Sequence, residues 1–195
     1  AIAIAVNGVP IFNALNNRGD DAFLAGELDD WGGHCGRADD YHYHVAPFHL
    51  QEIIGKKVPI AYALDGFAIY GENEVDGKKV FGLDEFNGHF DSKKSYHYHG
   101  TRGFPYINGG FKGIVAEVDD QVSPQASTRA FRPAGQPLRG ASITSFEQIG
   151  PNEYRMIYQL RENLYTITYE ATLHDVKINF VAPNGEIREE VYRRP

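Results

Sequence analysis

Residues 28–44 read LDDWGGHCGRADDYHYH, and residues 83–99 repeat the pattern as LDEFNGHFDSKKSYHYH. Eight of the 17 aligned positions are identical. Each copy places a histidine eight residues ahead of a histidine-x-histidine pair, which gives the pattern H-x7-H-x-H. Such an internal repeat predicts two halves that are built in the same way. The matching histidines are His34, His42 and His44 in the first copy and His89, His97 and His99 in the second.

The repeat extends upstream of the histidines. Residues 5–13, AVNGVPIFN, match residues 63–71, ALDGFAIYG, in an Asn/Asp-Gly pair, an isoleucine and an aromatic residue. The first histidine follows Asn7 by 27 residues and Asp65 by 24, so one intervening loop is three residues longer. Two like units can bury one shared face, which predicts packing about a pseudo-two-fold axis. The duplicated halves span about residues 1–56 and 57–120.

The composition favours strands and turns over long helices. The chain has 12 Tyr, 12 Phe, 21 Gly and 10 Pro, and runs of helix-favouring residues are scarce. We predict a mainly β fold with a few short helices, in which a pseudo-two-fold duplicated β-rich domain precedes a C-terminal antiparallel β-meander. Short helices are expected after Asp20-Asp21 and from Pro47 to Gly55.

Three regions follow one another along the chain. Residues 1–120 form the duplicated domain with the histidine motifs, and residues 121–140, with three prolines, form a predicted extended connection. Residues 141–195 alternate apolar and polar side chains between turn signals, which is typical of a meander. Its predicted strands are Ser142–Gln148, Tyr154–Leu160, Leu164–Ala171, Val176–Ala182 and Ile187–Tyr192.

The histidine spacing indicates metal ligands. In a strand, residues i and i+2 point to one face, so His42 and His44 project together, as do His97 and His99. The earlier histidine of each set follows a glycine, and the intervening length allows a return towards the pair. Three neutral imidazoles on one face suit zinc or copper and leave an open position. Two separate sites, one dinuclear site and one mixed site all fit the spacing; we favour convergence of both sets on the common axis.

Other polar residues near the motifs have weaker assignments. The tyrosines of each Tyr-His-Tyr-His segment should face the core and bond their hydroxyls at its rim. The matching Asp29 and Asp84 are either acceptors for imidazole N–H groups or turn residues. Cys35 has no counterpart in the second copy, which favours a buried thiol. His49 and His174 lie outside the motifs and are expected to be ordinary polar residues.

Charge and hydropathy exclude several classes of protein. The net charge of −7 lacks the basic footprint of a nucleic-acid binder. No stretch approaches about 18 consecutive apolar residues, so no membrane span is expected. The N-terminal AIAIAV has no preceding basic region and indicates a strand, not a signal peptide. The single cysteine rules out an intramolecular disulfide and a thiolate-rich zinc site.

The segments GGHCGRADDYHYHVAP, ALDGFAIYG and LDEFNGH, together with both Tyr-His-Tyr-His tetrapeptides, resemble the YHYH protein family. The resemblance covers roughly residues 5–115 and implies that the six histidines belong to a shared motif. Members of that family are largely uncharacterised, and many are exported, which implies an extracytoplasmic location. They often carry more cysteines than this chain, so no disulfide is carried over. The resemblance implies no particular reaction.

These observations predict a transition-metal-binding protein whose ligands are the six histidines, with copper slightly favoured over zinc. It is expected to be a metalloenzyme that acts on a small-molecule substrate, with hydrolytic chemistry for zinc or oxidative chemistry for copper. The alternatives are a non-catalytic metal-binding or storage module and a structural metal module.

Overall fold

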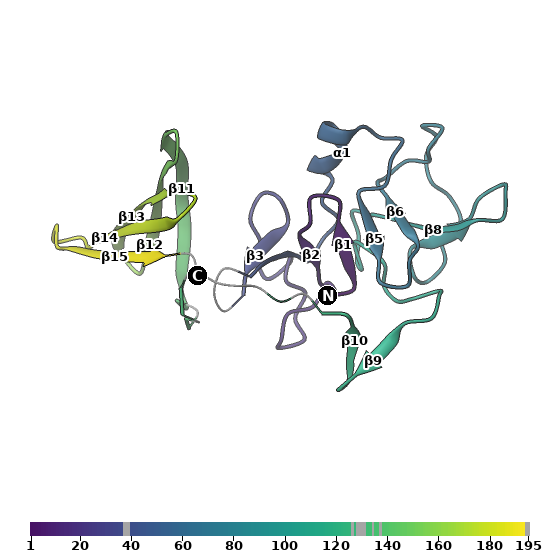
Figure 1. The fold of residues 1–195 in the computed structure, drawn as a ribbon, viewed down its shortest axis with the longest axis horizontal. Coiled ribbons are helices and arrows are strands. Elements are labelled where there is room, and N and C mark those ends of the chain that lie inside the picture. The colour runs from purple at the N-terminus through teal and green to yellow at the C-terminus, as the bar shows by residue number, and fades with distance from the viewer. Residues whose placement is uncertain (37–39, 126, 128–131, 134, 137, 194–195) are drawn as a thin grey trace. The chain divides into compact units, whose positions relative to one another are not determined.

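The computed structural model describes residues 1–36, 40–125, 127, 132–133, 135–136 and 138–193. The fold is mainly β, as predicted, with one short α-helix among these residues. Two compact units emerge from the described chain, one built by residues 1–36 and 40–127 and the other by the C-terminal meander. Figure 1 shows the strands of each unit.

An eight-stranded sheet organises the first unit. The strands are two to four residues long, and a glycine or proline follows most of them within a few residues. Their order in the sheet is β3-β4-β2-β1-β5-β6-β8-β7. The bounds are β1 Ala3–Ala5, β2 Pro10–Ile11, β3 Gly33–Cys35, β4 Tyr41–Tyr43, β5 Ala61–Ala63, β6 Ala68–Tyr70, β7 Gly88–Phe90 and β8 Tyr96–His99.

The strand order carries the pseudo-two-fold symmetry that the repeat predicts. If β1–β4 are exchanged with β5–β8, the new strand order is the original order read from the opposite edge of the sheet. The axis passes between β1 and β5, which pair antiparallel with Ile4 opposite Tyr62. On either side, Ala3 and Ala5 pair with Ala63 and Ala61, and all four are almost fully buried. Alanines at the axis therefore let the two halves meet as one continuous sheet.

The core lies against this central pair of strands. Ile11 and Ile69 occupy equivalent positions in β2 and β6, and both are completely buried. Tyr43 and Tyr98 of the histidine strands join the same cluster. Because side chains alternate across a strand, the tyrosines face the core while the histidines face the other way, as predicted.

One of the two expected helices forms. Helix α1 covers His49–Ile54 and ends at Gly55, as predicted. The prediction of a helix after Asp20-Asp21 is wrong. The Asp21 carboxylate accepts bonds from the Phe23 and Leu24 amides, but only one turn follows, because Gly26 adopts a φ of 69°. The second half lacks this turn, which accounts for its loop being three residues shorter.

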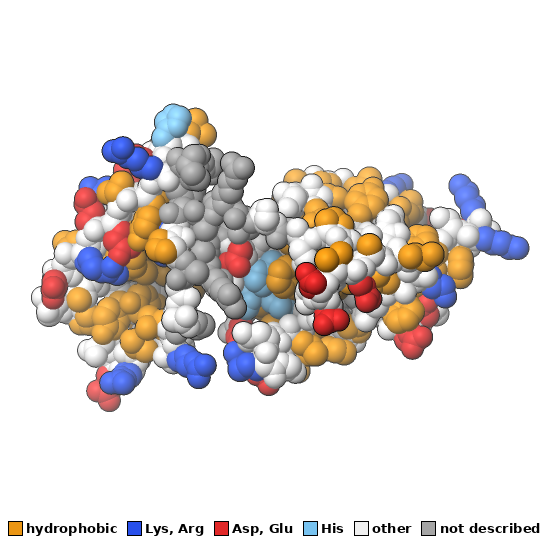
Figure 2. Space-filling model, turned by 60° about the horizontal axis from the view of Figure 1, so that its bottom comes forward, with side chains coloured by type: hydrophobic (Ala, Val, Ile, Leu, Met, Phe, Trp, Pro, Cys, Tyr) orange, Lys and Arg blue, Asp and Glu red, His pale blue; other side chains and the backbone are white. Residues whose placement is uncertain are grey.

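The C-terminal unit is a five-stranded antiparallel meander in chain order, as predicted. Stacked tyrosine pairs, Tyr154 with Tyr169 and Tyr158 with Tyr165, connect neighbouring strands on one face. Figure 2 shows hydrophobic side chains at the surface of this sheet. The strands are β11 Ala141–Gly150, β12 Glu153–Leu160, β13 Asn163–Ala171, β14 Asp175–Val181 and β15 Ile187–Arg193.

A two-stranded hairpin precedes the meander, β9 from Ala116 to Val118 and β10 from Gln121 to Ser123. Its second strand lies at the start of the segment predicted to be an extended connection. Among the described residues, no helix has the length and apolar character needed to cross a bilayer.

The buried tyrosine hydroxyls give a test of the packing of the two halves. Tyr98 donates to the Asp65 carboxylate at 2.6 Å, whereas its equivalent Tyr43 contacts the neutral Asn7 side chain at 3.0 Å. We predict that Tyr98→Phe lowers the free energy of unfolding by about 1.5–3 kcal/mol and Tyr43→Phe by only about 0.5–1.5 kcal/mol, because bonds to charged groups are stronger.

The measurement is urea unfolding followed by fluorescence of Trp31, the sole tryptophan, which lies in the first unit. A larger loss for Tyr43→Phe than for Tyr98→Phe would contradict this assignment of the two bonds.

Candidate metal centres

Two groups of side chains in the first unit could each hold a metal ion. We call His34, His42 and His44 the N-site, and Glu74, His89, His97 and His99 the C-site. In each group, one ligand atom per residue lies within 4.8 Å of all the others. The sheet register produces this closeness, because His34 lies opposite His42 in the β3–β4 pair and His89 lies opposite His97 in the β7–β8 pair.

The two groups are separate, so the predicted convergence of both histidine sets is wrong. The symmetry axis runs between β1 and β5, while the histidine strands lie towards opposite edges of the sheet. From β4 to β8 there are five strand-to-strand steps, about 24 Å in a flat sheet. The structure thus brings together three predicted histidines at each site and does not bring the six together.

Backbone carbonyls hold the imidazole rings in one orientation. The Nδ1 atoms of His42 and His44 donate to the Asp40 and Asn13 carbonyls at 2.7 and 2.6 Å. In the C-site, the Nδ1 of His99 donates to the carbonyl of Gly71 at 2.8 Å. A carbonyl oxygen only accepts, so each of these Nδ1 atoms carries the proton. Equivalent bonds at 3.1 Å join His34 to the Glu27 carbonyl and His89 to the Phe81 carbonyl.

The Nε2 atom of each ring that bonds a carbonyl through Nδ1 therefore keeps its lone pair. These rings are His34, His42, His44, His89 and His99. The Nε2 atoms of His34 and His44 are 3.2 Å apart, and those of His89 and His97 are 3.1 Å apart. The Nε2 of His99 is buried without a hydrogen-bond partner. Zinc–nitrogen bonds of about 2.0–2.1 Å in a tetrahedron place two nitrogens about 3.4 Å apart. The spacing matches nitrogens that share a cation.

Protonation is disfavoured at three of these rings. Burial lowers the pKa of His42 and His44, and it lowers the pKa of His99 to about 4. Near neutral pH these rings are uncharged, and their converging lone pairs repel. A metal ion would be attracted by the same arrangement.

Glu74 belongs to the C-site and was not predicted from the sequence. Its carboxylate lies 3.0 Å from the Nε2 of His89 and 3.6 Å from that of His97. It lies on a hairpin loop closed by a bridge between Asn73 and Lys79. The matching loop of the first half places Asn16 at this position. The sequence could have pointed to Glu74 through a difference between the two repeats, because Glu74 stands where the first half has Asn16.

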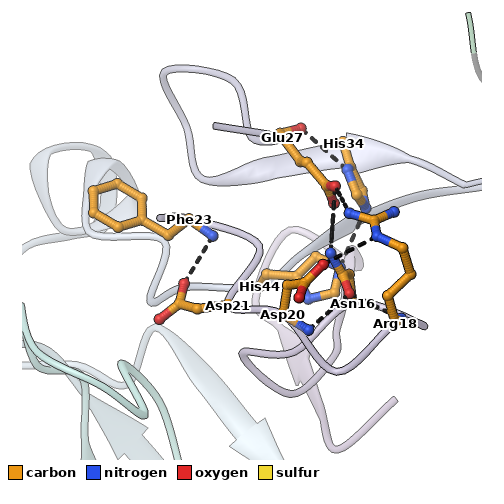
Figure 3. A network of polar contacts seen from close by, with 8 residues as sticks. All are labelled: Asn16, Arg18, Asp20, Asp21, Phe23, Glu27, His34 and His44. Atoms are coloured by element: carbon orange, nitrogen blue, oxygen red, sulfur yellow. Dashed lines mark hydrogen bonds and ion pairs between the residues drawn. The ribbon is translucent and has the colours of Figure 1, made fainter. Parts of the chain in front are cut away.

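An acidic side chain also lies beside the N-site, but it is bonded elsewhere. Glu27 forms an ion pair with Arg18 and accepts bonds from the Asn16 side-chain amide at 3.2 and 3.3 Å. Figure 3 shows these three residues next to His34 and His44. The Arg18 guanidinium lowers the pKa of Glu27, and His34 adds to that lowering.

Asp29 and Asp84 are turn residues and not acceptors for the imidazoles. Asp29 accepts bonds from the Gly33 amide and the Tyr41 hydroxyl, and Asp84 does the same for Gly88 and Tyr96. The hypothesis that they orient the histidines is therefore wrong, because backbone carbonyls take that role. Each aspartate instead fixes the turn that delivers the first histidine of its set.

The glycine before each first histidine is required by close packing. A Cβ at Gly33 would collide with the Tyr41 ring, and one at Gly88 would collide with the Tyr96 hydroxyl. The expectation that Cys35 is buried is wrong, since it lies on the exposed face of edge strand β3. His49 is an ordinary polar residue, as expected, and its Nε2 lies 3.3 Å from the Tyr43 hydroxyl.

Aromatic rings contact the histidines from β6 and the equivalent segment of the first half. Phe12 stacks on His42 with ring centroids 4.1 Å apart. Its counterpart in the repeat, Tyr70, meets His97 edge-on at 5.3 Å. The tyrosines of the Tyr-His-Tyr-His segments point into the core. Tyr70, whose ring contacts His97 and His99, was not selected by the sequence argument.

The lowered histidine pKa values predict how the metal-free protein responds to acid. His99 titrates near 6.5 when exposed and near 4 when folded, so the unfolded chain binds the extra proton first. Stability of the first unit should therefore fall as the pH drops from about 6.5 to 4, by up to about 1.4 kcal/mol per pH unit for this group. Urea midpoints from Trp31 fluorescence after chelation would measure it; midpoints that rise over this range would contradict the neutral, buried rings.

One family model matches the N-terminal part of the chain. Residues 1–79 match the family model described as YHYH protein. This stretch contains the whole N-site and the loop that carries Glu74. No curated protein and no solved structure matches the chain. The predicted resemblance is thus confirmed over this stretch, where residues 1–79 match the model of the YHYH protein family.

Proposed function

We propose that the protein binds a transition metal ion, copper or zinc, at both the N-site and the C-site. The observation that carries the proposal is the convergence of imidazole Nε2 atoms, with one pair in each site 3.1–3.2 Å apart, in two groups where five of the six rings bond a backbone carbonyl through Nδ1. Neutral imidazole suits zinc and copper, and a second bond that orients each ring is typical of metal-binding histidines.

We further propose that the bound metal supports catalysis. Three histidine ligands with a remaining position is the arrangement of catalytic zinc sites, and the N-site offers three histidines. Zinc at such a site would activate water for hydrolysis, whereas copper would supply redox chemistry. The ring of Tyr70 beside His97 favours the oxidative alternative at the C-site, because a tyrosine next to copper is a candidate redox partner.

The second candidate is a structural metal module. It is favoured by the C-site, where Glu74 adds a fourth protein donor to three histidines. Four protein ligands are typical of structural zinc sites. The donors come from the 73–79 loop and from β7 and β8, so an ion there would join three segments.

Metal content tests the proposal directly. Protein purified without chelator should carry about two equivalents of zinc or copper, one for each site. His34→Ala and His89→Ala should each lose about one equivalent, because each removes one ligand from a different site. These are the half-buried members of each set, so their removal disturbs the core least. The exposed His174→Ala is the matched control and should retain both.

Elemental analysis measures the outcome. A wild-type protein that holds no metal and takes none up on titration would overturn the proposal. Loss of both equivalents in each single variant would instead show that the two sites are not independent.

Proton competition gives a second test. Ligand imidazoles must be neutral, so affinity for zinc should decline as the pH falls below about 6, near the ordinary histidine pKa. Burial keeps His99 neutral down to about pH 4, so the decline should be shallower than for three exposed histidines. Calorimetric titration with zinc between pH 7 and 4 measures this. Affinity that is constant over the whole range would exclude histidine ligation.

A further inference from the structure

We infer that the two metal sites are not equivalent: the N-site keeps one coordination position open for exchangeable water beside Glu27, whereas Glu74 fills the corresponding position of the C-site. The inference rests on the proposed metal binding and assigns a different role to each site. The open position makes the N-site the place where a small substrate meets the metal.

The comparison is made at equivalent backbone positions. Loops 15–21 and 73–79 are each closed by one isolated bridge. The Asn16 amide donates to the Asp20 carbonyl, and the Glu74 amide donates to the Lys78 carbonyl, both at 2.8 Å. Gly19 and Gly77 then donate to the carbonyls of Asn16 and Glu74. The two hairpins therefore share one backbone arrangement and present different side chains, Asn16 and Glu74, at this position.

That side chain is a ligand candidate in one site only. The Glu74 carboxylate lies 3.0–3.8 Å from the Nε2 atoms of all three C-site histidines. The Asn16 oxygen is instead bonded within its own loop, where it accepts from the Arg18 and Asp20 amides at 2.9 and 3.0 Å. An amide nitrogen has no lone pair for a metal, so Asn16 leaves the N-site with three donors.

The N-site has a carboxylate nearby, but this carboxylate is held away from ligation. Glu27 is bonded to Arg18 and to the Asn16 amide nitrogen (Figure 3). Its backbone carbonyl accepts the bond from the Nδ1 of His34, which places Glu27 beside the N-site (Figure 3). A carboxylate in this position can accept a hydrogen bond from water on the metal, as activation of that water requires.

The experiment compares copper(II) at each site alone. His89→Ala leaves the N-site intact, and His34→Ala leaves the C-site intact. Solvent-proton relaxation reports exchangeable water on a paramagnetic ion. We expect relaxation per bound copper to be several-fold higher in His89→Ala than in His34→Ala.

Reciprocal exchange of the distinguishing residue is the control. Asn16→Glu added to His89→Ala should lower the relaxation, and Glu74→Asn added to His34→Ala should raise it. Both changes fit the hairpin, because each residue already occupies that position in the other half. Equal relaxation in the two single-site proteins, or no response to either exchange, would overturn the inference. Failure of both single-site proteins to bind copper would overturn the proposed function itself, and the inference with it.

Discussion

The bond from the imidazole Nδ1 to a backbone carbonyl, which five of the six motif histidines make, is the interaction on which the histidine sites depend. It decides which nitrogen keeps its lone pair, and the strand register then brings those lone pairs to about 3.1–3.2 Å. The rest of each motif serves this geometry. Asp29 and Asp84 fix the turns before the first histidines. Gly33 and Gly88 leave room for a tyrosine side chain, and buried tyrosines pack on the opposite face of the histidine strands. The spacing that the two repeats share therefore serves the packing of the strands as well as the placement of the histidines.

The duplication explains why there are two sites and why they differ. The halves meet through β1 and β5, where small alanines allow close pairing. Because these strands occupy the centre of the sheet, the histidine strands lie towards its two edges. Sites that share no ligand are free to diverge. The same hairpin presents Asn16 in one half and Glu74 in the other, and the same aromatic position holds Phe12 in one and Tyr70 in the other. Symmetry of the backbone thus coexists with different chemistry at the two sites.

Much of this architecture could be predicted from local patterns. The two-residue period placed the histidines of each pair on one face, and alternation with turn signals located all five meander strands. Glu74 escaped prediction because it lies in a charged loop with no periodic signal. The convergence of the sites was wrong because the repeat does not reveal which strands pair at the axis. The helix after Asp21 was wrong because Gly26 ends it after one turn.

The central claim is that each set of converging lone pairs holds its own metal ion. Anomalous X-ray scattering from crystals of the metal-loaded protein, recorded at the absorption edge of the metal found by elemental analysis, tests it most directly. The account predicts two peaks, one among the Nε2 atoms of His34, His42 and His44 and one among those of His89, His97 and His99, with the Glu74 carboxylate beside the second only. A single peak between the two halves, or peaks away from these nitrogens, would contradict it.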